Sequence, residues 1–420
     1  FGKPRPVPTT VAATGFRFPT PDGYDFYLNA MGPIGTANAK FLKDSVAFWT
    51  EALQHPNYDA FWQTRNLRPH LKGIRPKVMT VGGFFDAENL FGALEVYRTV
   101  EAQDRAADNT IVMGPWFHGG WARGDGQRLG DAYFDQRTSW FYRDSIEFPF
   151  FEWALRDVGR DPRAEAIMFD SGRNAWQRFD RWPAATGGHT HLWLGANGVA
   201  SFTAPSTRAR TTFTAWVSDP AKPVPFTAAI APGMTREYMT EDQRFVANRP
   251  DVLVFRTEPL TEDVTLAGPI MADLTIATSG TDADVVVKVI DVFPDSAANA
   301  PGDRAQWARG GYQMLVRGEP LRARFRKSFS VPTPFVANRP TVVQWRLNDV
   351  FHTFRKGHRI MVQVQATWFP LMDRNPQTYV PNIAFAAPSQ FVPATMRLYH
   401  MSHLGLPVLG RSAGGAHGAH

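Results

Sequence analysis

The fold of the first half of this chain is decided by two short runs, Val81-Gly82-Gly83-Phe84-Phe85-Asp86-Ala87-Glu88 and Gly114-Pro115-Trp116-Phe117-His118-Gly119-Gly120. Each run follows an apolar segment, residues 76–80 in one case and 110–113 in the other, that is typical of a buried strand. An acid and a histidine are therefore expected just past the C-terminal ends of two parallel strands.

Asp86 and His118 occur in the order of the last two members of the Ser…Asp…His relay of α/β-hydrolases. The carboxylate would orient the imidazole through its Nδ1–H, and we expect the two groups to lie roughly 2.6–3.2 Å apart. Two simpler interpretations stay open. Asp86 is also a favoured N-terminal cap for the helix that follows, and a single loop histidine is often an ordinary surface residue.

The nucleophile of such a relay is missing from the sequence. No Gly-x-Ser-x-Gly run occurs in the 420 residues, and the chain begins with Phe1 rather than Met. We interpret the sequence as a C-terminal portion of a serine hydrolase and expect it to be inactive alone. An alternative from another class is a non-catalytic binding protein, in which the second half binds a ligand and the hydrolase half is vestigial.

Composition excludes several classes of function. The net charge of +6 is mild and no Lys/Arg run reaches five residues, which argues against nucleic-acid binding. The absence of cysteine excludes disulfides, thiolate metal sites and a cysteine nucleophile. No apolar stretch approaches 18 residues, so no membrane span is expected.

The remaining histidines give no reason to expect a metal or an organic cofactor. His189 with His191, and His400 with His403, are the closest approaches to a metal-binding pair. Neither pair has a carboxylate or third ligand at a useful spacing, so structural roles are favoured for these residues.

A connector and a helical segment are expected before the first strand. Residues 1–25 are rich in proline and should be extended, whereas residues 26–72 have a helical pattern. The apolar residues expected to share one helix face are Leu42, Val46, Trp49 and Leu53. A helical insertion at this point suits a cap over an active site, although an ordinary helix pair packed on a sheet fits the pattern equally.

Residues 73–160 follow a β-α-β-α pattern, which predicts part of a parallel sheet. The expected helices cover about residues 88–104 and 134–158. Two strands do not make a stable sheet, so the rest of the sheet is expected upstream of this chain.

After about residue 161 the hydrophobic period changes to two, and short strands alternate with Pro/Gly turns. The turn Asn197-Gly198 predicts a hairpin, and alternation over residues 359–366 predicts a strand buried on one face only. Residues 161–405 are therefore expected to form a β-sandwich of the jelly-roll type, followed by a disordered tail over residues 406–420.

Glu88 adds a second carboxylate at the mouth of the expected site. A carboxylate in this position can pair with an ammonium group of a substrate. The alternative is that Glu88 only stabilises the N-terminus of the following helix through the helix dipole.

Together, G-G-F-F-D-A-E-N-L-F-G-A-L and G-P-W-F-H-G-G-W resemble the acid and histidine segments of the α-amino-acid ester hydrolases. These enzymes belong to a larger group with the cocaine esterase-like hydrolases and the X-prolyl dipeptidyl peptidases. The resemblance implies an α/β-hydrolase domain with an inserted helical cap, followed by a jelly roll that closes one side of the pocket. It also suggests a periplasmic or secreted location.

The resemblance also implies roles for four residues. Asp86 matches the relay acid and His118 the relay histidine, while Glu88 matches one member of a carboxylate cluster that holds the substrate α-ammonium. Asn89 stands where the ester hydrolases have a second acid, which halves the local negative charge. The nucleophilic serine would lie in a G-x-S-Y-x-G elbow upstream.

We therefore expect a serine hydrolase or acyltransferase that acts on small-molecule esters or amides, with α-amino acids as the preferred acyl groups. An X-prolyl dipeptidyl peptidase and a general carboxylesterase are the nearest alternatives. No cofactor, nucleic acid or membrane is expected as a partner, and the protein could form a homo-oligomer.

Overall fold

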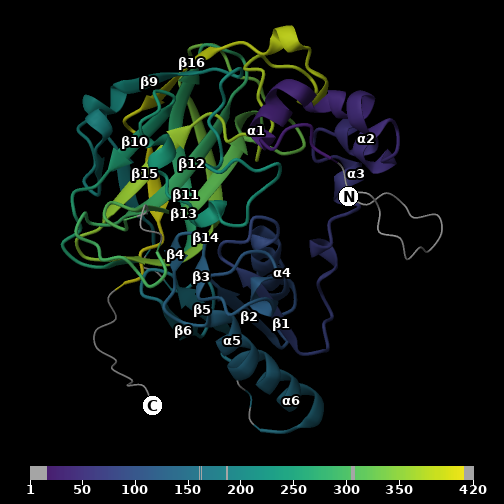
Figure 1. The fold of residues 1–420 in the computed structure, drawn as a ribbon, viewed down its shortest axis with the longest axis vertical. Helices are drawn as coiled ribbons and strands as arrows, with labels where there is room; N and C mark the ends of the chain where they lie inside the picture. The colour runs from purple at the N-terminus through teal and green to yellow at the C-terminus, as the bar shows by residue number, and fades with distance from the viewer. Residues whose placement is uncertain (1–16, 160, 162, 186–187, 304–307, 411–420) are drawn as a thin grey trace.

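The computed structural model describes residues 17–159, 161, 163–185, 188–303 and 308–410. Most of the expected connector and most of the expected tail lie outside these residues. The described chain has an α/β part and a larger β-sandwich, with the sandwich above the α/β part in Figure 1. Among the described helices, none is long and apolar enough to cross a membrane.

The α/β part is built on a four-stranded sheet with the order β1-β2-β5-β6. Its strands are β1 (Val78–Gly83), β2 (Asn109–Gly114), β5 (Ala166–Asp170) and β6 (Ala175–Phe179). β1 and β2 are parallel, with Val78 opposite Asn109 and Gly83 opposite Gly114. The two expected strands and their parallel direction are confirmed.

The sheet continues past residue 161, where the sequence predicted a change to the sandwich. β5 pairs in parallel with β2, and β6 then pairs with β5 in the antiparallel direction. The residues of β5 are all buried, and Ala166-Ile167-Met168-Phe169 is apolar at every position. A strand covered on both faces carries no alternation, so its sequence does not reveal which sheet it joins.

Helices flank this sheet near the expected positions. α4 (Leu90–Gln103) connects β1 to β2 and buries Leu94 and Tyr97. The second helical segment begins at Thr138 rather than near residue 134. Its three parts are α5 (Thr138–Tyr142), η6 (Arg143–Glu147) and α6 (Phe148–Arg156). α6 lies at the lower end of the molecule in Figure 1.

The segment before β1 is helical but broken into short pieces. They are α1 (Gly23–Asp25), η1 (Phe26–Met31), η2 (Ile34–Thr36), η3 (Asn38–Leu42), α2 (Ala47–Gln54), α3 (Ala60–Gln63) and η4 (Arg68–His70). The expected face shared by Leu42 and Trp49 is wrong, because Lys43 and Asp44 have φ angles of 46° and 60° and separate η3 from α2. Hydrophobic periodicity does not report such a backbone turn.

These short helices contact loops of the sandwich. The amide of Tyr58 donates to the carbonyl of Phe329 at 2.9 Å, and the side-chain amide of Asn382 donates to the carbonyl of Leu53 at 2.7 Å. Figure 1 likewise places α1, α2 and α3 beside the sandwich. A role of this segment as a cap stays a prediction.

The sandwich consists of two sheets. The first has the order β10 (Val252–Arg256), β15 (Arg359–Gln365), β12 (Asp284–Val292) and β13 (Gln313–Arg322). The second has the order β8 (Ala200–Ser201), β7 (Thr190–Leu194), β17 (His403–Leu406), β11 (Val264–Thr278), β16 (Ala394–Tyr399) and β9 (Phe213–Ser218), with β14 (Thr341–Phe354) paired to β11. The hairpin expected at Asn197-Gly198 is confirmed, because β7 and β8 pair in the antiparallel direction.

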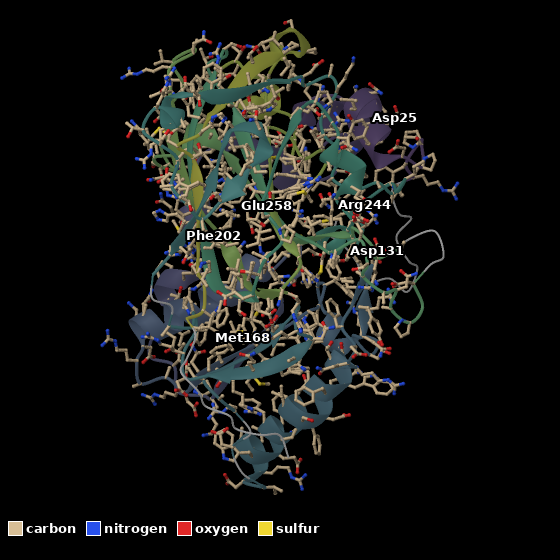
Figure 2. The ribbon with its side chains drawn as sticks, turned by 90° about the vertical axis from the view of Figure 1, so that its left-hand side faces the viewer. Asp25, Asp131, Met168, Phe202, Arg244 and Glu258 are labelled. Carbon is tan, nitrogen blue, oxygen red and sulfur yellow. The ribbon has the colours of Figure 1, made fainter. Side chains whose placement is uncertain are left out.

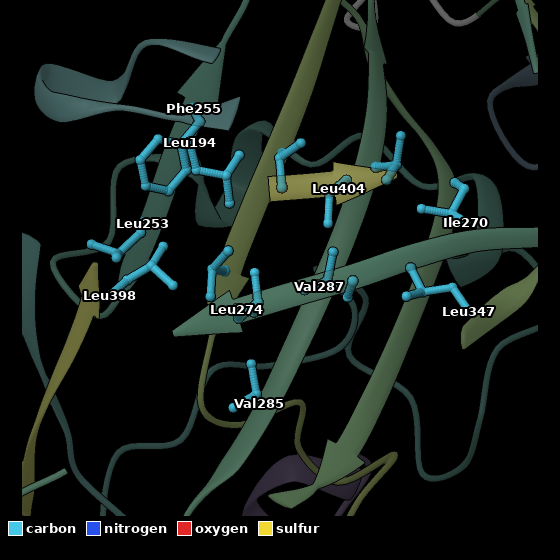
Figure 3. Packing of buried hydrophobic residues seen from close by; sticks show 14 of the residues in the cluster. Leu194, Leu253, Phe255, Ile270, Leu274, Val285, Val287, Leu347, Leu398 and Leu404 are labelled. Atoms are coloured by element: carbon cyan, nitrogen blue, oxygen red, sulfur yellow. The ribbon is translucent and has the colours of Figure 1, made fainter. Parts of the chain in front are cut away.

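Apolar side chains from the facing sides of these two sheets form the main core. Figure 3 shows this packing, in which Leu274 and Leu404 of one sheet meet Val285 and Val287 of the other. The burial of these side chains supplies the hydrophobic stabilisation of the sandwich.

The other face of the first sandwich sheet is also covered. Met361, Gln363 and Gln365 are fully buried, so the expectation that β15 is buried on one face only is wrong. Met361 belongs to a second apolar cluster that also contains Phe84 and Leu94 of the α/β part. The sandwich therefore packs directly behind the segment that carries Asp86.

Hydrogen bonds connect the end of β5 and the β5–β6 turn to β14. The carboxylate of Asp170 accepts from the amide of Thr353 at 2.9 Å, and Ser171 Oγ lies 2.9 Å from His352 Nδ1. His352 Nε2 lies 3.2 Å from the buried Asp291 of β12. A Cβ atom at Gly172 would come within 1.9 Å of the Thr353 carbonyl oxygen, so the two backbones approach too closely for any other residue.

Candidate active site

The turn that carries Asp86 is fastened to the segment that carries His118. The amide of Phe84 donates to Gly114 at 2.8 Å, and the amide of Phe85 donates to Trp116 at 3.2 Å. A Cβ atom at Gly83 would lie 2.0 Å from the Trp116 carbonyl oxygen. Glycine at this position allows the two strand ends to approach closely.

The two carboxylate oxygens of Asp86 have different partners. Oδ1 accepts the backbone N–H groups of Glu88 and Asn89, at 2.8 and 2.9 Å. Oδ2 lies 3.1 Å from Nδ1 of His118, which is within the distance expected from the sequence. The capping and relay interpretations of Asp86 are therefore compatible, because each uses a different oxygen.

His118 lies in the loop after β2 and is partly open to solvent. The carboxylate facing Nδ1 favours the tautomer with the proton on Nδ1, which leaves Nε2 as the basic nitrogen of the neutral ring. Within the described part of the chain, Nε2 has no hydrogen-bond partner. Gly119, with a φ angle of 73°, lets the backbone turn immediately after the histidine.

Glu88 and Asn89 both lie at the surface immediately after Asp86. Asn89 is the N-cap residue of α4, but its side chain makes no capping hydrogen bond. The Glu88 carboxylate meets no hydrogen-bond donor or cation among the described residues. The side chain of Glu88 is therefore exposed to solvent two positions after Asp86.

The structure adds a sandwich segment that the hydrophobic pattern did not assign to the site. Arg236 places its guanidinium 5.0 Å from the ring centre of Phe117, the neighbour of His118. Tyr238 in η9 (Tyr238–Thr240) is buried, and its pKa is raised by burial, with the charges of Glu319 and Asp86 acting in the same direction. The run Arg236-Glu237-Tyr238-Met239-Thr240 is visible in the sequence, but only the fold places it here.

A cavity of about 900 Å³ lies between the hairpin of β3 (Arg128–Leu129) and β4 (Ala132–Tyr133) and loops of the sandwich. Tyr238 is part of its wall. Figure 2 labels two other wall residues, Asp131 and Arg244, which lie on the same side of the molecule. Over the described residues, no group of three or more acidic or histidine side chains is placed to hold a metal ion.

The comparison with known families agrees with this arrangement. Residues 157–404 match the family model described as the X-Pro dipeptidyl-peptidase C-terminal non-catalytic domain. The chain belongs to the X-Pro dipeptidyl-peptidase family. Residues 21–120, which include Asp86 and His118, match the model described as X-Pro dipeptidyl-peptidase (S15 family). The predicted family and the predicted fold class, an α/β-hydrolase part followed by a β-sandwich, are confirmed.

Three known proteins are similar to this chain along most of its length. The chain is 28% identical over 378 residues to cocaine esterase from Rhodococcus sp. (strain MB1 Bresler), covering 86% of this chain and 61% of that protein. The solved structure of an α-amino acid ester hydrolase has 38% identity and a TM-score of 0.86, over 94% of this chain and 66% of that one. An aminopeptidase from the marine sediment archaeon Thaumarchaeota archaeon has 36% identity and a TM-score of 0.87, over 96% and 66%.

These relatives are serine hydrolases, with esterase and peptidase names among them. The chain spans less than two thirds of the length of each of the three.

Proposed function

We propose that this chain supplies the acid and the histidine of a serine hydrolase that acts on esters or amides of α-amino acids through an acyl-enzyme. The observation that carries the proposal is the 3.1 Å contact between Asp86 Oδ2 and His118 Nδ1 at the ends of neighbouring parallel strands. The similarity to an α-amino acid ester hydrolase supports the choice of substrate. The nucleophile would come from a segment outside these 420 residues, so the chain alone should be inactive.

In this proposal His118 moves the protons. As the serine Oγ forms a bond to the substrate carbonyl carbon, its proton passes to Nε2 of His118, and Asp86 stabilises the resulting imidazolium. His118 then gives that proton to the leaving alcohol or amine as the acyl–oxygen or acyl–nitrogen bond breaks. Water repeats the sequence on the acyl-enzyme, so the serine and the imidazole are restored.

Glu88 would hold the substrate α-ammonium. Its carboxylate lies two positions after Asp86, at the surface, and has no protein partner among the described residues. Asn89 adds a neutral amide where a second carboxylate would strengthen the attraction. We therefore expect a preference for free α-amino groups that is weaker than two carboxylates would give.

The second candidate is an X-prolyl dipeptidyl peptidase, because the matching family models carry that description. Such an enzyme also binds an α-ammonium, so the same residues would serve. A general carboxylesterase would not need Glu88. The proposed catalytic pair lies outside the region that matches the non-catalytic domain.

One set of assays tests these proposals on the protein that includes the nucleophile segment. An α-amino ester, its N-acetylated form and an X-Pro amide are compared, with His118→Ala as the control. We expect rapid hydrolysis of the amino ester, slow hydrolysis of the N-acetylated form, and loss of both with His118→Ala. Faster cleavage of the X-Pro amide would identify a peptidase, and turnover that survives His118→Ala would overturn the relay.

A further inference from the structure

Arg317 of β13 contacts the turn that carries Asp86. Its side chain is 0% exposed, and its Nη2 donates to the carbonyl of Phe84 at 2.8 Å and to the carbonyl of Asp349 at 3.0 Å. Phe84 precedes Asp86 by two positions. A sandwich residue that is more than 200 positions away in the chain thus holds the backbone beside the proposed relay acid.

The burial of this guanidinium is costly. Burial lowers the pKa of Arg317, against the opposing effects of the negative charges of Glu319 and Asp349. Nε and Nη1 have no hydrogen-bond partner among the described residues. A buried cation with unused donors is a poor source of stability, so its contact with Phe84 points to a positional role.

Arg317 and Gly114 together hold the backbone of Phe84 in place. The N–H of Phe84 is bound to Gly114, and its carbonyl is bound to Arg317, so both backbone hydrogen-bonding groups have a partner. The Gly114 bond ties the turn to the strand that leads to His118. The Arg317 bond ties the same residue to the sandwich.

The sandwich also holds the chain after Asp86. Asp349 of β14 is fully buried, and its Oδ2 accepts from Trp182 Nε1 at 2.6 Å and from the guanidinium of Arg98. Arg98 belongs to α4, the helix that follows the Asp86 turn. The contacts of Arg317 and Asp349 therefore fix the backbone before Asp86 and the helix after it.

We infer that Arg317 is a positioning residue for the Asp86–His118 pair, because it holds the Phe84 carbonyl so that Asp86 Oδ2 faces His118 Nδ1. The inference rests on the proposed function. It gives the sandwich, whose family description is non-catalytic, a direct part in the geometry of the relay.

The test uses ¹⁵N-histidine NMR of this chain, which reports the ring nitrogen that carries the proton. In the parent chain, neutral His118 should carry it on Nδ1, and Asp86→Ala should remove that preference. Arg317→Met should shift the population toward the Nε2–H form, and Arg317→Lys should shift it less. The matched control is Arg324→Met.

Arg324 is suited to this purpose because it is also a buried arginine of the sandwich. It binds Asp282 and the carbonyl of Val380, far along the chain from the Phe84 turn. Arg324→Met should lower Tm without changing the His118 signal. A parent-like His118 signal in Arg317→Met, or an equal change in Arg324→Met, would overturn the inference. If Arg317→Met does not fold, a parent-like signal in Arg317→Lys has the same meaning.

The NMR readout needs no turnover, so it separates this inference from the proposed reaction. In the protein that includes the nucleophile, Arg317→Met should lower kcat by on the order of 10²-fold while KM changes little, because the catalytic groups are displaced and the substrate contacts remain. An altered tautomer without any hydrolase activity in the parent protein would reject the reaction and keep the positional role.

Discussion

Asp86 Oδ2 and His118 Nδ1 lie 3.1 Å apart, although the Asp86 side chain is 1% exposed and the His118 side chain is 39% exposed. The acid is thus held inside the protein by its two N–H donors and the imidazole, whereas the imidazole itself is partly exposed to solvent. A buried orienting acid and an accessible base are what proton transfer to an external nucleophile requires.

The first prediction concerns the two functions of Asp86. Asp86→Asn keeps an oxygen for the N–H groups of Glu88 and Asn89, but its amide donates to Nδ1 and forces the His118 proton onto Nε2. The equivalent change in a serine protease lowers kcat by about 10⁴-fold. We expect a loss of that order in the intact enzyme, with Tm almost unchanged, measured by ester hydrolysis and calorimetry. Activity within tenfold of the parent would exclude Asp86 from the relay.

The second prediction concerns the close approach at Gly83. Gly83→Ala places a Cβ atom 2.0 Å from the Trp116 carbonyl oxygen, so the acid and histidine segments must separate. We expect a loss of about 1–3 kcal/mol in the free energy of unfolding, measured by denaturant titration. Gly233→Ala is the control, because a Cβ atom there meets no atom within 4 Å. Equal stability of the two variants would contradict the described packing.

The third prediction concerns selectivity. If Glu88 binds the substrate ammonium, Glu88→Gln removes a charge-assisted bond worth about 1.5–3 kcal/mol, which corresponds to about 10- to 150-fold in kcat/KM. The loss should affect α-amino esters and spare their N-acetylated forms, and Asn89→Asp should act in the opposite direction. An equal effect of Glu88→Gln on both substrates would instead assign Glu88 to the support of Asp86 or α4.

The fourth prediction concerns Lys288, which is fully buried in β12. Burial lowers its pKa from 10.5 to about 7, against the opposing charge of Glu241. The folded chain releases this proton near pH 7 and the unfolded chain near pH 10.5, so unfolding takes up a proton between these values. The free energy of unfolding should therefore increase with pH over this range.

Replacement of the buried amine should remove that dependence. Lys288→Met is expected to raise Tm near pH 7 and to flatten the curve of stability against pH between about 7 and 10.5. The exposed residue Lys222 provides the control, because Lys222→Met removes a lysine without removing a buried charge. An unchanged pH slope in Lys288→Met would show that other groups dominate in this range.

The sequence allowed the prediction of the relay pair because local signals surround both residues. Apolar strands end at glycine-rich turns, and the acid and the histidine follow in each case. The second covered face of β15 was not predictable in this way, because Gln363 and Gln365 look like solvent-facing residues and are buried only by the packing of the two parts of the chain.

Arg317 and Tyr238 could not be predicted as neighbours of the site, for a different reason. Both lie more than 100 positions after His118, Tyr238 in η9 and Arg317 in β13, and the local pattern of these elements describes only the sandwich. Their closeness to Asp86 arises from tertiary packing. No periodicity or short motif contains that information.

The hydrogen bonds between Asp170 and Thr353 have a consequence for recombination within the family. A chimaera with its crossover near residue 160, close to the start of the match at residue 157, would take β5 from one parent and its partner β2 from the other. It would keep β5 with β6 and β14 but separate it from β2. A crossover after β6 keeps β5 with β2. The contacts of Asp170, Ser171 and Gly172 must then form with the β14 of the other parent. A functional exchange of sandwiches therefore requires that β5 be compatible both with β2, its partner strand, and with β14.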